Sequence, residues 1–153
     1  MVMHPEHGCV GYFSLLTDSI NLKPNKELKQ KWESKGIRFN ALPALKIGRL
    51  ATHKDHEGKG IGRTMIANIL LAVLTSIIPK AGCRYITVDA LPNAVQWYEQ
   101  LKFKKLEKAK EHQHNVAMYL DLEELFTAFI NKIKETVGDQ GHASTGHPPF
   151  YYP

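Results

Sequence analysis

The sequence contains little cysteine and no long uninterrupted apolar segment. Cys9 and Cys83 are too few for a scaffold built on disulfides, and Cys83 opens an apolar stretch, as is typical of a small buried side chain. The longest apolar run, residues 66–78, includes three polar residues and is shorter than the roughly 20 residues that span a bilayer. No positively charged leader with an apolar core opens the chain. These absences predict a cytoplasmic protein without a membrane partner.

Acidic side chains are outnumbered as well, since 15 Asp and Glu stand against 20 Lys and Arg for a formal charge of +5. This balance favours anionic partners such as nucleotides, coenzymes or RNA, although a solvated basic surface has the same composition. The apolar fraction of 43% in 153 residues suits one hydrophobic core. We expect a single domain over residues 1–137 and a disordered tail over 138–153, which has no hydrophobic period.

Hydrophobic patterning predicts a mixed α/β chain. β-branched, aromatic or alternating apolar residues predict strands over residues 9–22, 44–52, 83–91, 103–108 and 115–122. Apolar residues at helical spacing predict helices over residues 60–78, 93–101 and 122–137. The charged segment 25–36 is expected to be a short exposed helix or a mobile connection. Asn93 is the expected N-cap of its helix, and Gly48 within a strand indicates a bulge or a closely packed neighbour.

A glycine-rich turn lies between the second predicted strand and the long helix, in the stretch "LATHKDHEGKGIGRTM". Gly58, Gly60 and Gly62 alternate with other residues where the helix begins. The first N–H groups of a helix lack internal acceptors and carry partial positive charge, so phosphate binds there, and glycine lets it approach the backbone. Lys59 and Arg63 add formal charge to the same turn. The pattern predicts a phosphate site, with a tight turn of no binding function as the alternative.

Two common phosphate motifs do not match this turn. No Gly-Lys-Ser/Thr follows a glycine at the spacing of the P-loop, and the spacing G-x-G-x-G differs from the dinucleotide pattern G-x-G-x-x-G. The ligand must therefore be of another phosphate class.

The segment "IGRLATHKDHEGKGIGRTMI" resembles the coenzyme A motif of the GNAT superfamily of N-acetyltransferases, written Q/R-x-x-G-x-G/A. Gly60 and Gly62 match its glycines, and Glu57 stands where the family has Gln or Arg. A second block, "VDALPNAVQWYEQLKFKKL", is similar to the family segment N-x-x-A-x-x-x-Y-E-x-x-G-F. Its matching residues are Ala94, Tyr98, Glu99 and Phe103. Lys102 replaces the usual glycine and Leu91 the usual Asn, with Asn93 two residues away.

The resemblance covers about residues 10–122. Some segments within this range look especially like the bacterial toxin-like members of the family. It implies a mixed, mostly antiparallel sheet with splayed central strands flanked by helices. The gap between strands 45–52 and 84–90 would admit the pantetheine arm. The family's first strand, two helices and next strand have no counterpart in the short segment 1–9, and the helix at 122–137 is additional. Compared with the family, the chain would then be N-terminally shortened, or its sheet could be completed by a homodimer or by the additional C-terminal helix.

The resemblance also implies acetyl-CoA as co-substrate, no metal, and direct transfer of an acetyl group to an amine. The implied coenzyme-binding residues are Leu50, Ala51, Thr52, Gly58, Lys59, Gly60, Ile61, Gly62, Arg63 and Asn93. Backbone groups of residues 50–52 would bind the pantetheine and polarise the thioester carbonyl. Tyr98 would protonate the departing thiolate, although a tyrosine packed beside Trp97 could be purely structural.

The acceptor and the base stay open. An amine-bearing small molecule, a peptide or a charged tRNA could receive the acetyl group, and an antitoxin is a possible partner. Glu57, Asp89 and the histidines are candidate bases by residue type alone. The histidine pairs His53/His56 and His112/His114 lack a Cys or Glu at zinc spacing and are expected to be solvated. A degenerate, non-catalytic acyl-CoA-binding or interaction module is the alternative function.

Overall fold

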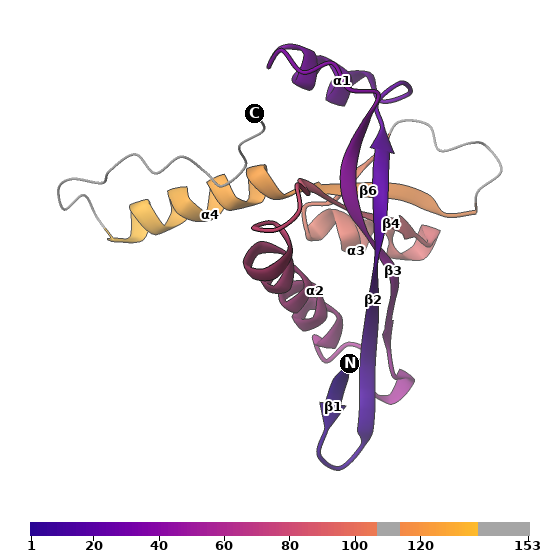
Figure 1. Cartoon of the computed structure of the whole chain (residues 1–153). Coiled ribbons are helices and arrows are strands. Elements are labelled where there is room, and N and C mark those ends of the chain that lie inside the picture. Colours follow the sequence, from indigo (N-terminus) through magenta and orange to yellow (C-terminus); the bar gives the residue numbers. More distant parts are fainter. Residues whose placement is uncertain (107–113, 138–153) are drawn as a thin grey trace.

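A computed structural model describes residues 1–106 and 114–137, so the predicted tail and the end of the strand predicted over 103–108 lie outside the described residues. Six strands form one sheet in the order β1-β2-β3-β4-β6-β5 (Figure 1). The strands are β1 Val2–His4, β2 Gly8–Asn21, β3 Ala41–Thr52, β4 Tyr85–Ala90, β5 Lys104–Lys105 and β6 Val116–Asp121. The helices are α1 Lys26–Glu33, α2 Ile61–Ala72, α3 Val95–Gln100 and α4 Leu122–Val137, with short helical turns η1 Lys54–His56, η2 Val73–Ile77 and η3 Pro92–Ala94.

The strand pairing confirms the predicted fold class. β3 and β4 are parallel, whereas the other strand pairs within the described residues are antiparallel. The parallel pair is connected through α2, as a crossover requires. None of the helices in the described ranges is both long and apolar enough to cross a membrane.

Three details differ from the sequence prediction. The segment 25–36 forms helix α1, but this helix is not simply exposed, because Leu28 and Trp32 are buried. β1, which was not predicted, pairs with the start of β2 as a hairpin. Asn93 is not the N-cap of α3, because Pro92 starts the turn η3 and Ala94 takes the N-cap position without a side-chain hydrogen bond. The helix predicted over 60–78 is confirmed as α2, and its last turn, η2, has π-helical hydrogen bonding.

The two faces of the sheet carry separate apolar clusters. On one face, Ile86 and Val88 of β4 belong to a buried cluster with residues of α2 and α3, including Ile69. On the other, Trp32 of α1 and Tyr85 of β4 belong to a second cluster. The side chains of β4 thus alternate between the two clusters, as expected of a strand covered on both faces.

Halfway along, β3 and β4 separate. Their paired positions run from Ala44↔Tyr85 to Ile47↔Val88, yet β3 continues to Thr52 and β4 to Ala90. On the other side of β3 the register shifts, so that Gly48 has no partner in β2. A Cβ on Gly48 would lie 2.8 Å from Leu16 Cδ1. Both expectations for this glycine therefore hold, since it marks a bulge and also accommodates a packed neighbour.

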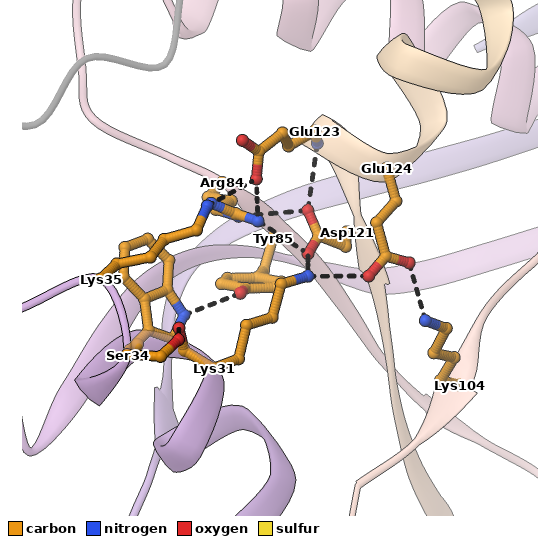
Figure 2. A network of polar contacts seen from close by, with 10 residues as sticks. Lys31, Ser34, Lys35, Arg84, Tyr85, Lys104, Asp121, Glu123 and Glu124 are labelled. Atoms are coloured by element: carbon orange, nitrogen blue, oxygen red, sulfur yellow. Dashed lines mark hydrogen bonds and ion pairs between the residues drawn. The ribbon is translucent and has the colours of Figure 1, made fainter. Parts of the chain in front are cut away.

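An ion-pair network attaches α1 to the junction of β6 and α4 (Figure 2). Asp121 accepts two hydrogen bonds of 3.1 Å from Arg84 and one of 2.9 Å from Lys31. Its Oδ1 also accepts the backbone N–H of Glu123 at 3.0 Å, at the first turn of α4. Lys31 bonds to Glu124 at 2.8 Å as well. Asp121 therefore links three elements from a nearly fully buried position.

Candidate functional site

The glycines of the turn have reasons in the chain itself. Gly58 and Gly60 have φ of 73° and 82°, in the left-handed region that favours glycine, and Gly60 is the N-cap of α2. A Cβ at either position would meet no atom within 4 Å, so the space beside them is open. A Cβ on Gly62 would instead lie 3.1 Å from Trp97 Cζ2. Conformation and helix packing thus explain the glycines, and a ligand can still approach two of them.

The N-terminus of α2 is suited to an anion. The N–H of Thr64 donates to Gly60 O at 3.1 Å and begins the intrahelical hydrogen bonds. The preceding N–H groups of Ile61, Gly62 and Arg63 therefore have no acceptor within the helix. No acidic residue lies in the first turn, and Arg63 Nη2 bonds to Gln100 Oε1 at 3.2 Å. The partial charges of the helix and the guanidinium both favour a negative group here.

Two cavities meet beside this turn. The first, about 570 Å³, is lined by Leu50, Thr52, His56, Glu57, Gly58, Gly60, Ile61, Gly62, Arg63, Ala94, Trp97 and Tyr98. The second, about 310 Å³, lies where β3 and β4 separate and is lined by Tyr12, Ile47, Gly48, Arg49, Leu50, Ala51, Val88, Asp89, Ala90, Leu91, Ala94 and Tyr98. Leu50, Ala94 and Tyr98 line both cavities, so these three residues mark their junction.

Most of the residues expected to bind coenzyme line these cavities. Lys59 and Asn93 line neither of the two. Lys59 extends its Nζ to within 3.5 Å of His56 Nδ1, beside the first cavity. Asn93 is exposed in η3.

Tyr98 lies at the junction of the cavities and is 6% exposed. Its ring packs edge-on against Trp97 and Phe103, with centroid distances of 4.8 and 5.2 Å. Burial raises the pKa of Tyr98 above its usual range, so the phenol keeps its proton at neutral pH. The protonated side chain therefore has a packing role and, at the same time, lines both cavities.

The structure adds residues that the sequence did not single out as part of the site. Tyr12 lines the second cavity, and its pairing with Ala51 across β2 and β3 is a register that sequence patterns leave open. Of the candidate bases, Glu57 lines the first cavity and Asp89 the second. Asp89 forms an ion pair with Lys46 of β3.

Comparisons with known proteins identify a family and several similar folds. The sequence model of the acetyltransferase (GNAT) domain matches residues 6–105. Similar solved structures include a bacterial toxin, with a TM-score of 0.64 and 16% identity over 87% of this chain and 68% of that chain. AtaT complexed with acetyl-methionyl-tRNAfMet has a TM-score of 0.61 and 24% identity over 82% of this chain and 70% of AtaT. A tyrosine-to-phenylalanine mutant of KacT has a TM-score of 0.61 and 23% identity over 78% of this chain and 66% of KacT.

At these identities the structural likeness shows the fold, and the chain spans about two thirds of each of these three proteins. The sequence match, in contrast, extends over more than half of the chain and includes both the glycine turn and Tyr98. The chain belongs to the GNAT acetyltransferase family.

Proposed function

We propose that this protein is an acetyl-CoA-dependent N-acetyltransferase that transfers the acetyl group directly to a primary amine. The observation that carries the proposal is the junction of the two cavities at Tyr98, with an anion-binding helix terminus in one cavity and separated strands in the other. Acetyl-CoA carries a diphosphate at one end and a thioester at the other, so a site for it needs both features.

The coenzyme would lie across both cavities. Its diphosphate would accept hydrogen bonds from N–H groups of the turn between Gly58 and Arg63, and the Arg63 guanidinium would add charge. The backbone of residues 50–52, which β4 does not pair with, offers hydrogen bonds to the amides of pantetheine. Solved structures of AtaTR with acetyl-CoA support this class of co-substrate.

The chemistry would proceed without a covalent enzyme intermediate. A neutral amine would attack the thioester carbon, the C–S bond would break, and the nitrogen would give its proton to water. Tyr98 would donate its phenolic proton to the thiolate that leaves and would regain a proton from solvent. Holding both reactants at the junction of the cavities supplies much of the rate.

A charged tRNA is the acceptor best supported among the three classes considered. The formal charge of +5 suits a polyanion, and one relative is known in complex with acetyl-methionyl-tRNAfMet. A small-molecule amine or a peptide amine is the alternative. One relative, a mutant of the toxin AtaT, is bound to the C-terminus of the antitoxin AtaR, so an antitoxin is a proposed partner here. A second copy of this chain is a further proposed partner. The proposed location is the cytoplasm.

The test is acetyl transfer by the purified protein to aminoacyl-tRNA, a small primary amine and a peptide, followed as release of free CoA thiol and by mass spectrometry of the acceptor. Uncharged tRNA is the control, because it offers the same phosphates without an amine. We expect an acetylated aminoacyl group with charged tRNA alone. Binding of acetyl-CoA without transfer to any acceptor would favour a non-catalytic module, for which Glu57 in the first cavity is the supporting observation.

A further inference from the structure

The hairpin of β1 and β2 brings two histidines against two others from the turn after β3. The histidine cluster consists of His4, His7, His53 and His56. The ring centroids are 4.6 Å apart for His4 and His7, 5.0 Å for His7 and His56, and 6.0 Å for both His4–His56 and His53–His56. His56 lines the first cavity, so the cluster extends from the proposed diphosphate site to the surface.

The charges around the cluster are finely balanced. Lys59 Nζ lies 3.5 Å from His56 Nδ1, and Asp55 lies 3.7 Å from His53 Nδ1. The charged groups of residues 1–9 and 53–60 are the Met1 amino group, Glu6, Lys54, Asp55, Glu57 and Lys59, beside the thiol of Cys9. Three positive groups against three carboxylates leave this region without net charge while the imidazoles are neutral. Protonation of even two imidazoles makes it positive.

The arrangement suits an anion better than a metal ion. In residues 1–106 and 114–137, no group of three or more histidine, cysteine, aspartate or glutamate side chains is placed to hold a metal. Desolvation lowers the pKa of His56, and the positive charges of Lys59, His7, His4 and His53 lower it further. A dianion placed among these groups would remove that repulsion, and each imidazolium can donate two hydrogen bonds to it.

We propose that the histidine cluster and Lys59 form a subsite for a phosphomonoester, which is the group that coenzyme A carries on its ribose in addition to the diphosphate. This inference rests on the proposed function and extends the first cavity toward the N-terminal hairpin. The subsite binds when imidazoles are protonated, so coenzyme binding takes up protons. Affinity therefore rises as the pH falls through the range in which histidine titrates.

The experiment compares acetyl-CoA with acetyl-dephospho-CoA, which lacks only the phosphomonoester, by calorimetry at pH 6.5 and 8.5. We expect acetyl-CoA to bind about three- to tenfold more tightly at the lower pH, with proton uptake, and the dephospho form to show little pH dependence. The double variant His4→Asn/His7→Asn lies outside the glycine turn. In this variant the affinity for acetyl-CoA should no longer depend on pH in this way, and the dephospho form should bind as it does to the natural protein. His114→Asn, before β6, is the matched control.

The ligand's own phosphate also titrates, and the double variant separates that effect from the cluster. An unchanged pH dependence in the double variant would overturn the subsite while leaving the coenzyme proposal intact. Equal pH dependence of the affinities for acetyl-CoA and acetyl-dephospho-CoA would also overturn the subsite and leave the coenzyme proposal intact. If neither ligand bound at either pH, the proposed function itself would fail, and the subsite with it.

Discussion

At the residue scale, Gly60 is where backbone conformation and ligand space coincide. Its φ of 82° places it in the left-handed region, and the space beside it is open. A side chain there costs about 1 kcal/mol in folding free energy, which a domain of this size tolerates. A change at this position can therefore alter binding without preventing folding.

Gly60→Glu is expected to abolish acetyl-CoA binding, because a carboxylate would occupy the position of the proposed diphosphate. Calorimetry at neutral pH measures the loss. Gly36→Glu is the matched control, since Gly36 has φ of 77°, has no atom within 4 Å of a Cβ and lines neither cavity. The two variants should lose similar stability, and only the first should lose binding. Retained binding in Gly60→Glu would remove the turn from the coenzyme site.

Tyr98→Phe is expected to leave acetyl-CoA binding unchanged and to lower kcat by about a hundredfold, because the thiolate would leave without its proton donor. Steady-state kinetics measure kcat, using the acceptor that is acetylated in the transfer assay. Calorimetry measures the affinity for acetyl-CoA. Tyr119→Phe is the control, because Tyr119 belongs to the apolar cluster on the opposite face of the sheet. Equal kcat for Tyr98→Phe and the natural protein would leave Tyr98 a packing residue.

At the scale of elements, the network around Asp121 secures α1 to the sheet. Burial alone would raise the pKa of this carboxyl, but hydrogen bonds from Arg84 and Lys31 outweigh burial and hold the pKa below its usual range. Its stabilising contribution is present above about pH 4, the unfolded value, and is lost as the pH falls through the lower folded value.

Asp121→Asn is expected to lower the free energy of unfolding by about 3 kcal/mol, because it removes the nearly fully buried one of the two carboxylates, Asp121 and Glu123, that pair with the buried Arg84. Urea denaturation at pH 7 measures this free energy. When the pH is lowered from about 4 to 2, the free energy of unfolding should fall by less in the variant than in the natural protein. Asp55→Asn, at a side chain 80% exposed, should change stability by less than about 0.5 kcal/mol. A similar acid sensitivity in all three proteins would contradict the role of Asp121.

The elements themselves could largely be predicted, because their hydrophobic periods are strong. The hairpin at β1 could not, since Val2–His4 is short and is followed by Pro5. The bulge at Gly48 was indicated by its residue type, but its place in the register depends on pairing with β2. The histidine cluster gave no signal either, because contact between His7 and His56 arises from strand order and not from spacing in the sequence.

At the scale of the whole molecule, coenzyme binding should stabilise the fold. A ligand at 100 times its Kd adds about 2.7 kcal/mol to the free energy of unfolding. For a chain of this length we expect saturating acetyl-CoA to raise Tm by about 5–10 °C. Differential scanning fluorimetry measures the shift, and Gly60→Glu should show none. An equal shift in that variant would indicate binding elsewhere.

The lining of the second cavity includes residues from Tyr12 in β2 to Tyr98 in α3, and β4 joins β3 through the long crossover. During synthesis on the ribosome, the chain therefore has no complete pocket until β4 and α3 have emerged. A nascent or prematurely terminated chain ending at Ala72 would retain the glycine turn but lack one wall of the pocket. Such fragments should be inert toward the coenzyme, so any activity would appear only late in translation.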